Sequence, residues 1–450
     1  MTPNRLAYAE ALSALESRGR FGIRLGLSRT RALLAGLGNP ERGFRGVLIT
    51  GTNGKGSVHA LVASALTAAG YRVGQTPKPH LVTYRERLQI GGVPVDPETF
   101  ARLTGEVLAI SDRVARRHGD PTEFELLTAI TFLWFAESDI DLAVVEVGLG
   151  GRLDATHAWD GGVAAVTNVS LDHMDRLGDT VDAIAREKAA IIMRGDLAVT
   201  GANGSPLEII RRRARGVAAP LTVVEPAPIL AVDRNGVEVD LGLLGPVRIG
   251  LRGRHQAANA AVADAIVDAF GAAGIATVPD AARRAGYASV QWPGRLELVA
   301  TGGREVLLDG AHNPAGAATL ASALDELGPL LRPGQATLVL AIMADKDVDG
   351  VITALAASAF LRKARVICTA PSGGRALPAD RLASRWSALA GRPAEAIAEP
   401  GAALDAALAT GDGPVVVAGS LYLVGAARAI LVSDPLLVPD PPIPQTQKVP

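Results

Sequence analysis

Short apolar runs alternate with Ala-rich helical segments along the first half of the chain. Residues 46–50 form an apolar run that ends in glycines, and residues 57–70 have a helical pattern. Two more apolar runs, residues 141–151 and 162–170, end in glycine-rich or polar turns, and residues 180–195 are predicted as a helix closed by a glycine. Apolar strands separated by helices are typical of a parallel, doubly wound sheet.

The pattern changes in the middle of the chain and then returns. Between residues 221 and 252, short alternating segments are separated by turn signals such as Asn235-Gly236, which predicts a small antiparallel flap. Residues 254–271 again have a helical pattern. A break follows at "VQWPGR", residues 290–295, and we place a domain boundary there.

Beyond this boundary, strands and Ala-rich helices alternate again, which predicts a second, smaller, Rossmann-like α/β domain. The expected fold class is therefore α/β, with a doubly wound, mainly parallel sheet and a flap in residues 1–290 and the second domain in residues 291–434. Residues 435–450 are Pro-rich and are predicted to lack fixed structure. The strands predicted in the second domain are residues 305–309, 336–342, 365–369 and 414–418.

Composition narrows the class of protein. The 450 residues contain 45 Lys plus Arg and 46 Asp plus Glu, so no basic excess indicates binding to nucleic acid or to a membrane surface. One cysteine, Cys368, excludes an intrachain disulfide and fits a reducing compartment. The N-terminal segment lacks the apolar core of a signal peptide, and the apolar stretch at residues 415–427 is short for a membrane span of about 20 residues. We expect a cytoplasmic protein.

The stretch "TGTNGKGS" lies between a predicted strand and a predicted helix, which is the context of a phosphate-binding loop. Its spelling is compressed, because Gly51 precedes Gly54 by three positions and Gly56 separates Lys55 from Ser57. The glycines let the backbone approach phosphates, Lys55 can reach the terminal phosphates, and the Ser57 hydroxyl can bind Mg²⁺. The alternative is a glycine-rich turn without a ligand.

Three further side chains of the first domain have a chemical and a plainer interpretation. Glu146 ends an apolar strand, where a P-loop protein places an acidic metal partner, and His173 follows the next strand. A polar residue at a strand end and a structural histidine are the alternatives. Lys188 lies in a predicted helix, so it is either a surface lysine that extends into solvent or a partly buried amine with a lowered pKa.

The second domain has a comparable cluster. Asp309 and His312 in "LLDGAHNPAGA" come directly after a predicted strand and before a helix that starts near Pro314. Arg295, at the domain boundary, could reach a nucleotide phosphate, for which a guanidinium is well suited. An ion pair between the domains is the alternative for Arg295.

Together these motifs resemble folylpolyglutamate synthase/dihydrofolate synthase, a family of the Mur ligase superfamily. The resemblance runs in order from about residue 20 to Val424, and the family's P-loop has the same compressed spelling and holds ATP. The motifs that carry it are TGTNGKGS (50–57), GLGGRLDAT (148–156), TNVSLDH (167–173), Glu187-Lys188, RHQAAN (254–259), Pro293–Arg295 and DGAHNP (309–314).

The resemblance implies ATP-dependent amide formation by a ligase. A carboxylate of dihydropteroate or tetrahydrofolate is expected to attack the γ-phosphate of ATP, and the amine of L-glutamate then displaces phosphate from the acyl phosphate. Mg²⁺, Lys55 and Arg295 are expected to neutralise the transferring phosphoryl group. Closure of the two domains would exclude water.

The resemblance also assigns residues to roles. Nucleotide binding falls to Gly51, Thr52, Asn53, Gly54, Lys55, Gly56, Ser57, Asn259, Arg295, Asp309 and His312. Two Mg²⁺ ions would use Ser57, Glu146, His173 and a carbamylated Lys188, and the substrate would contact Phe124, Arg152 and Asp154. The catalytic residues would be Lys55, Lys188, Arg295 and His173.

One position departs from the family pattern. The family usually has Ser-Pro-His-Leu where this chain has "KPHL", Lys78 to Leu81, and that serine serves the first metal site. An ammonium cannot bind a cation, so Lys78 is left out of the expected metal ligands, and the site is expected to be reorganised with Lys78 supplying charge.

Three alternatives remain at this point. A peptidoglycan-precursor ligase shares the ATPase core but carries a nucleotide-sugar domain before the P-loop, where this chain has about fifty residues. A P-loop kinase or GTPase would not require "DGAHNP", and a GTPase would need an Asn-Lys-x-Asp motif, which the sequence lacks. A non-catalytic nucleotide-binding module is the third. The sequence does not separate dihydrofolate synthase from folylpolyglutamate synthase, and it leaves a monomer as the working expectation.

Overall fold

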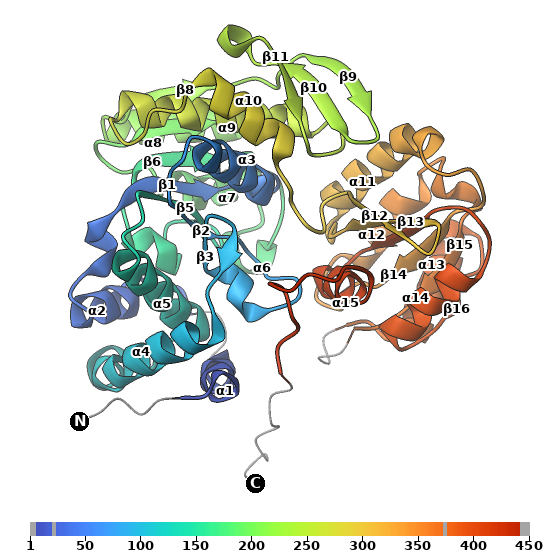
Figure 1. The fold of residues 1–450 in the computed structure, drawn as a ribbon, viewed down its shortest axis with the longest axis horizontal. Helices are drawn as coiled ribbons and strands as arrows, with labels where there is room; N and C mark the ends of the chain where they lie inside the picture. The colour runs from blue at the N-terminus through green and yellow to red at the C-terminus, as the bar shows by residue number, and fades with distance from the viewer. Residues whose placement is uncertain (1–5, 20–23, 372–375, 442–450) are drawn as a thin grey trace.

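The computed structural model describes residues 6–19, 24–371 and 376–441, which form two α/β domains side by side (Figure 1). The described part of the first domain contains an eight-stranded sheet in the order β4-β3-β2-β5-β1-β6-β7-β8, parallel from β2 to β8. Its strands are β1 (Arg45–Thr50), β2 (Val73–Thr76), β3 (Gln89–Ile90), β4 (Val93–Pro94), β5 (Leu142–Glu146), β6 (Gly162–Val166), β7 (Leu197–Thr200) and β8 (Leu221–Val223).

Helices cover both faces of this sheet, which is why consecutive residues within its central strands are apolar. Alternate residues enter different cores: Leu48 and Val145 pack on one side of the sheet, and Val47, Ile49 and Val144 on the other. The first core is covered by α1 (Tyr8–Gly19), α2 (Ser28–Gly36), α4 (Pro97–His118), α5 (Glu123–Glu137), α7 (Val181–Ala189) and α8 (Gly204–Gly216). The second is covered by α3 (Lys55–Ala68), α9 (Gln256–Ala272) and α10 (Asp280–Ser289).

Two details of the first domain correct the sequence prediction. Residues 221–223 are not the start of the flap but the edge strand β8; the flap consists of β9 (Ile229–Asp233), β10 (Gly236–Asp240) and β11 (Pro246–Ile249). The helix predicted to reach Gly195 ends at Ala189. Ile191 and Ile192 are buried in the core beyond it, so tertiary packing overrides the local helical pattern there.

The second domain is also doubly wound, which confirms the expected fold class. Its described residues form a six-stranded sheet in the order β12-β13-β17-β14-β15-β16, parallel except for β12. The strands are β12 (Glu297–Thr301), β13 (Arg304–Asp309), β14 (Thr337–Leu340), β15 (Arg365–Cys368), β16 (Glu395–Ala396) and β17 (Val415–Ala418). The helices are α11 (Pro314–Leu327), α12 (Val348–Ala356) and α13 (Ala379–Ala390) on one face, and α14 (Pro400–Ala409) and α15 (Leu421–Leu431) on the other.

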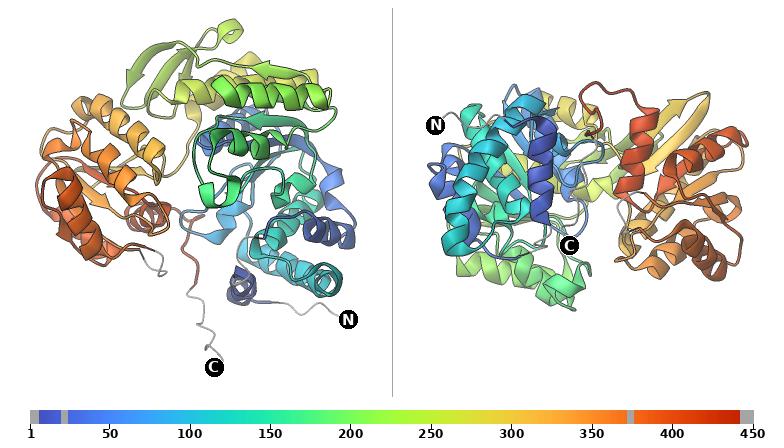
Figure 2. Two further views of the ribbon diagram at one scale, coloured as in Figure 1. Left: turned by 180° about the vertical axis from the view of Figure 1, so that it is seen from behind. Right: turned by 90° about the horizontal axis from the view of Figure 1, so that it is seen from below.

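The chain passes between the domains at residues 290–296 and again after α15, where the tail returns toward the first domain (Figure 2). The Asp440 carboxylate accepts hydrogen bonds from the Tyr8 hydroxyl, the Thr83 hydroxyl and the Tyr84 backbone N–H, each at 2.6 Å. The tail, which is predicted to lack fixed structure, thus contacts the first domain through Asp440, although residues 435–441 form no helix or strand. Residues 442–450 of the predicted tail lie outside the described residues.

No described helix is both long enough and apolar enough to cross a membrane.

Candidate active site

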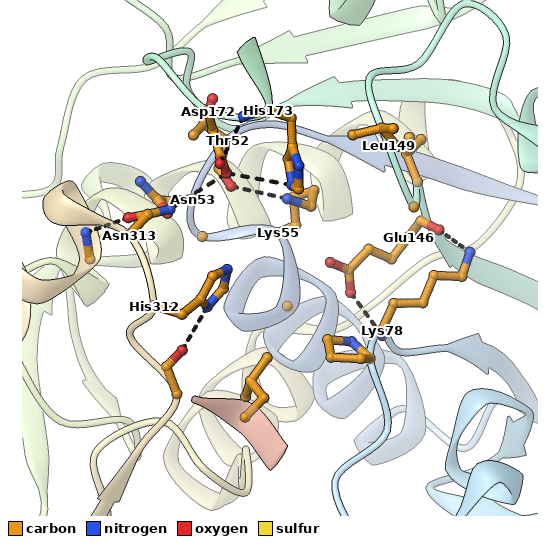
Figure 3. A pocket seen from close by; sticks show the side chains of 18 of the residues that line it. Thr52, Asn53, Lys55, Lys78, Glu146, Leu149, Asp172, His173, His312 and Asn313 are labelled. Carbon is orange, nitrogen blue, oxygen red and sulfur yellow. Dashed lines mark hydrogen bonds and ion pairs between the residues drawn. The ribbon is translucent and has the colours of Figure 1, made fainter. Parts of the chain in front are cut away.

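The two sheets turn their carboxyl ends toward one cavity of about 850 Å³ (Figure 3). Both domains contribute to its wall, as expected for open α/β sheets, which bind ligands outside these ends. The expected site residues that line it are Thr52, Asn53, Gly54, Lys55, Gly56, Ser57, Phe124, Glu146, Asp154, His173, Asn259, Arg295, Asp309 and His312. Gly51 and Lys188 line a smaller neighbouring cavity, and Arg152 lines neither.

The P-loop joins β1 to α3, as the sequence predicts. Gly51 passes so close to the neighbouring strand end that a Cβ atom there would lie 1.8 Å from Thr167 Oγ1. Gly54 has φ +80°, and a Cβ atom would lie 2.3 Å from Asn259 Oδ1. Only glycine fits either position, and the loop delivers the N-terminal N–H groups of α3 to the cavity, where they suit a phosphate.

Lys55 is half-buried beside this loop. Its Nζ donates hydrogen bonds to Gly51 O at 2.9 Å and Thr52 O at 3.0 Å. Burial lowers its pKa, while the nearby Glu146 and Asp172 carboxylates oppose that shift. An ammonium so poorly solvated binds an incoming polyphosphate strongly.

Residues of the segment after β6 hold the P-loop in shape, a role that the sequence alone did not predict. Asn168 Oδ1 accepts a hydrogen bond from Asn53 N at 2.9 Å, and the Thr167 hydroxyl donates to Asn53 O at 2.7 Å. The Thr52 hydroxyl donates to Ser170 O at 3.1 Å. The signal was present, because these residues lie in "TNVSLDH" directly after β6, the strand that pairs with β1.

Glu146 ends β5 with only 3% of its surface exposed. In the described part of the chain, the one hydrogen bond to its carboxylate comes from Lys78 N, at 3.3 Å. Burial raises its pKa, and the nearby cations Lys55, Lys78 and Arg295 oppose that shift. A buried carboxylate that accepts so few hydrogen bonds suits a bound cation.

Mg²⁺ fits this donor set when the nucleotide supplies part of its coordination. No three His, Cys, Asp or Glu side chains converge anywhere in residues 6–19, 24–371 and 376–441. Mg²⁺ is usually held by one or two carboxylates together with substrate phosphates and water. Glu146 and the buried Ser57 hydroxyl, both on the cavity wall, match that pattern.

Lys188 is buried, with 4% exposure, so its interpretation as a solvent-exposed surface lysine is wrong. Its Nζ donates a hydrogen bond to Gly51 O at 2.8 Å. Burial, assisted by the Lys55 charge, lowers its pKa to about 7. The amine borders the smaller cavity, of about 30 Å³, together with Lys55, Asp172 and His173.

His173 lies at the mouth of both cavities, in the left-handed region at φ +49°, just before α6 (Met174–Leu177). Its side chain is 41% exposed, and Nε2 lies 3.8 Å from Asp172 Oδ2. Asp172 lines both cavities as well, and the sequence analysis did not select it.

The edge of the second domain presents side chains that are tied to its own backbone. The Asp309 carboxylate accepts hydrogen bonds from Leu296 N at 2.9 Å and Ala311 N at 2.8 Å. His312 Nδ1 lies 2.8 Å from Gly310 O, and burial lowers the His312 pKa to about 4, so its ring is neutral at physiological pH.

Two polar side chains lie where the domains approach one another. Asn313 caps α11 through Gly316 N at 2.7 Å, and its Nδ2 lies 3.5 Å from Asp172 Oδ2 of the first domain. Arg295 lines the cavity and donates a hydrogen bond to Gly294 O at 3.1 Å. Within the described residues it forms no ion pair across the domains, so its guanidinium is available to a ligand.

Another part of the cavity wall contains Phe124 and Asp154, which both lie against Gly148 after β5. The Asp154 carboxylate accepts hydrogen bonds from Leu149 N at 2.8 Å, Thr156 N at 3.0 Å and the Thr156 hydroxyl at 2.5 Å, so it fixes the shape of its own loop. Arg152 points away and pairs with Glu187 at 2.8 Å.

Lys78 also lines this wall, from the segment after β2. Its Nζ lies 2.5 Å from Glu146 O and 4.6 Å from the centre of the Phe124 ring. Burial lowers its pKa to about 8, which leaves it protonated at neutral pH.

Comparisons with known proteins agree with this geometry. The Mur ligase middle domain matches residues 49–267, and the Mur ligase glutamate ligase domain matches residues 294–421. The dihydrofolate synthase/folylpolyglutamate synthase of Mycobacterium tuberculosis is 36% identical to this chain, over 91% of this chain and 90% of its own length. That of Bacillus subtilis is 35% identical, over 78% and 83%.

Solved structures extend the likeness to three dimensions. Folylpolyglutamate synthase of Mycobacterium tuberculosis, complexed with ADP and AMPPCP, matches with a TM-score of 0.84 at 33% identity, covering 94% of this chain and 99% of that one. E. coli FolC in complex with DHPP and ADP matches with a TM-score of 0.82 at 30% identity, covering 94% and 97%. In sequence and in the fold of both domains, this chain belongs to the folylpolyglutamate/dihydrofolate synthase family of Mur ligases.

Proposed function

We propose that this chain is an ATP-dependent ligase that adds L-glutamate to a carboxylate of dihydropteroate or of a folate, and releases ADP and phosphate. The observation that carries the proposal is the cavity of about 850 Å³, lined at once by the P-loop, Glu146, Phe124 and the second domain's His312. A triphosphate and an aromatic carboxylic acid can meet there. The relatives' names and the ADP and AMPPCP complexes of similar structures support the same activity.

The chain's own residues deal with the central difficulty of the reaction, which is the repulsion between two anions. The substrate carboxylate attacks the γ-phosphorus, ADP leaves, and the glutamate amine then displaces phosphate from the acyl phosphate. Lys55 and Arg295 lower the energy of the charge that develops on the transferring phosphoryl group. The N–H groups at the start of α3 hold the remaining phosphates, and the second domain keeps water away from the acyl phosphate.

We assign one Mg²⁺ to Glu146 and Ser57, and a second to His173 and Lys188. When bound, these ions supply Lewis-acid polarisation of the phosphoryl oxygens. For Lys188 we assign a carbamate. The neutral amine adds carbon dioxide and loses a proton, and the oxygens of the resulting anion can bind Mg²⁺. Its lowered pKa and the adjoining cavity of about 30 Å³ support that assignment.

The test is a coupled assay of phosphate release. The protein receives ATP and Mg²⁺ with dihydropteroate or tetrahydrofolate, with or without L-glutamate, and the products are weighed by mass spectrometry. We expect phosphate release to require both the pteroyl compound and glutamate, and the product to gain one glutamate residue. Phosphorylation of a substrate without any need for glutamate would favour a kinase instead.

A further inference from the structure

We propose that Lys78 binds the reacting carboxylate of the pteroyl substrate and holds it beside the γ-phosphate. The inference rests on the proposed function, because the carboxylate in question belongs to that substrate. It gives a substrate-binding role to a residue that the expected site set leaves out.

The ammonium of Lys78 lies on the substrate side of the cavity. Figure 3 shows its Nζ at the backbone carbonyl of Glu146, while the Glu146 carboxylate accepts a hydrogen bond from the Lys78 backbone N–H and not from the ammonium. The ammonium also lies over the Phe124 ring, 4.6 Å from its centre. Lys78 therefore lies between the aromatic wall and the nucleotide loop, where the carboxylate of a substrate packed on Phe124 has to arrive.

The hydrogen-bonding capacity of Lys78 is only partly used. An ammonium has three donors, and within the described residues its one hydrogen-bond acceptor is Glu146 O. Asp154, an acidic residue of the same cavity, uses its carboxylate to accept hydrogen bonds from Leu149 and Thr156. The Asp154 and Glu146 charges act on Lys78, but neither carboxylate forms an ion pair with its ammonium within the described residues. A half-buried cation with unused donors is suited to an anion that arrives with the ligand.

Hydrogen bonds fix the backbone that follows Lys78, and this restricts the position of its side chain. Glu86, 8% exposed, accepts hydrogen bonds from Leu81 N at 3.1 Å, Val82 N at 2.7 Å and Thr83 N at 2.8 Å. These bonds fix the turn that follows Lys78, and its Nζ is anchored to Glu146 O at the other end. A charge held in place in this way needs no rearrangement when the substrate binds.

The test compares two ligands on three proteins. Binding of dihydropteroate, and of the same pterin–aniline lacking its carboxylate, is measured by fluorescence titration with ADP and Mg²⁺ present, so that nothing turns over. The proteins are the wild type, Lys78→Met, which removes the charge at similar length, and Lys363→Met as a control at an exposed lysine of the second domain. We expect the wild type and the control to prefer the carboxylate-bearing ligand by roughly 10- to 100-fold, and Lys78→Met to lose that preference.

The outcomes separate the two proposals. If the wild type binds neither ligand, the proposed function fails. If the wild type shows the preference and Lys78→Met keeps it, the role of Lys78 fails alone. An equal loss of affinity for both ligands would make Lys78 a structural residue, and weaker ADP binding with the preference intact would place it on the nucleotide; both outcomes overturn the inference.

Discussion

The two sheet edges that meet at the cavity are built alike but use their polar side chains differently. Each is a strand–loop–helix junction at the carboxyl end of a parallel sheet. At the first edge, Glu146 and Lys188 are buried and Lys55 is half-buried, and burial shifts the pKa of all three. At the second edge, Asp309 and Asn313 bond the backbone of their own loop or of the linker.

We interpret this difference as a division of roles: the first edge acts in the reaction, and the second edge stabilises the fold. Buried charges without full partners cost folding free energy, and that cost is recovered only when a ligand binds. The satisfied side chains of the second edge stabilise the fold instead, and Asp309 in particular fixes the linker at Leu296. Substitutions at the first edge should therefore remove activity, whereas those at the second should also weaken the fold.

The largest effect is expected for Lys55→Met. Loss of the ammonium that faces the phosphates should lower kcat by on the order of 10²- to 10³-fold. The melting temperature should stay within a few degrees of wild type, because a buried charge is replaced by an apolar chain of similar length. Steady-state kinetics and calorimetry check this; near-normal turnover would remove the P-loop lysine from the mechanism.

Lys188→Ala should come next, with a loss of activity on the order of 10²-fold. The wild-type protein should carry the extra mass of one carbon dioxide at Lys188, and a short carboxylic acid should partly restore the variant. Only the neutral amine reacts, and the pKa is lowered to about 7, so the adduct should increase as pH rises through 7 and be lost below it. An unmodified Lys188 in an active preparation would refute the carbamate.

Asp309→Ala tests the supporting edge. It leaves the backbone N–H groups of Leu296 and Ala311 without their acceptor, so the free energy of unfolding should fall by about 1–3 kcal/mol. The KM for ATP should rise by about tenfold, while the pteroate KM changes little. His312→Ala should raise the ATP KM with a smaller loss of stability. If either variant altered only pteroate affinity, the nucleotide would lie elsewhere.

The smallest effects are expected for substitutions in the loop that contains Arg152 and Asp154. Asp154→Ala releases three hydrogen bonds within its loop, and should raise the KM for the pteroyl substrate several-fold while sparing ATP. Arg152→Ala is the matched control from the same loop, because its side chain is exposed and paired with Glu187. A substrate KM raised by Arg152→Ala would show that this loop turns inward when the substrate binds.

Much of the site was predictable because its signals are local. A few residues of sequence are enough to recognise the glycine-rich turn between a strand and a helix. The same is true of Glu146 at a strand end. What sequence reasoning missed depends on distant contacts: Asp172 matters because Asn313 approaches it from the other domain, and Asp440 because Tyr8 and Thr83 surround it.

The errors have the same cause. The helix predicted to reach Gly195 stops at Ala189 because the core buries Ile191 and Ile192. The direction of the Arg152 side chain likewise depends on a distant contact: it shares a loop with Asp154, yet it pairs with Glu187 of α7 and does not line the cavity. Its contact with the substrate stays a prediction. Local pattern predicts which element forms, but side-chain direction depends on neighbours that the pattern does not contain.

The returning tail gives the molecule a second mechanical attachment. Asp440 is bonded to Tyr8, Thr83 and Tyr84, so a second stretch of chain connects the smaller domain to the first. The ion pairs Arg234–Glu305 and Arg254–Glu326 add contacts between the domains on the flap side. Any rotation that widens the cavity therefore has to pivot about these contacts or break them.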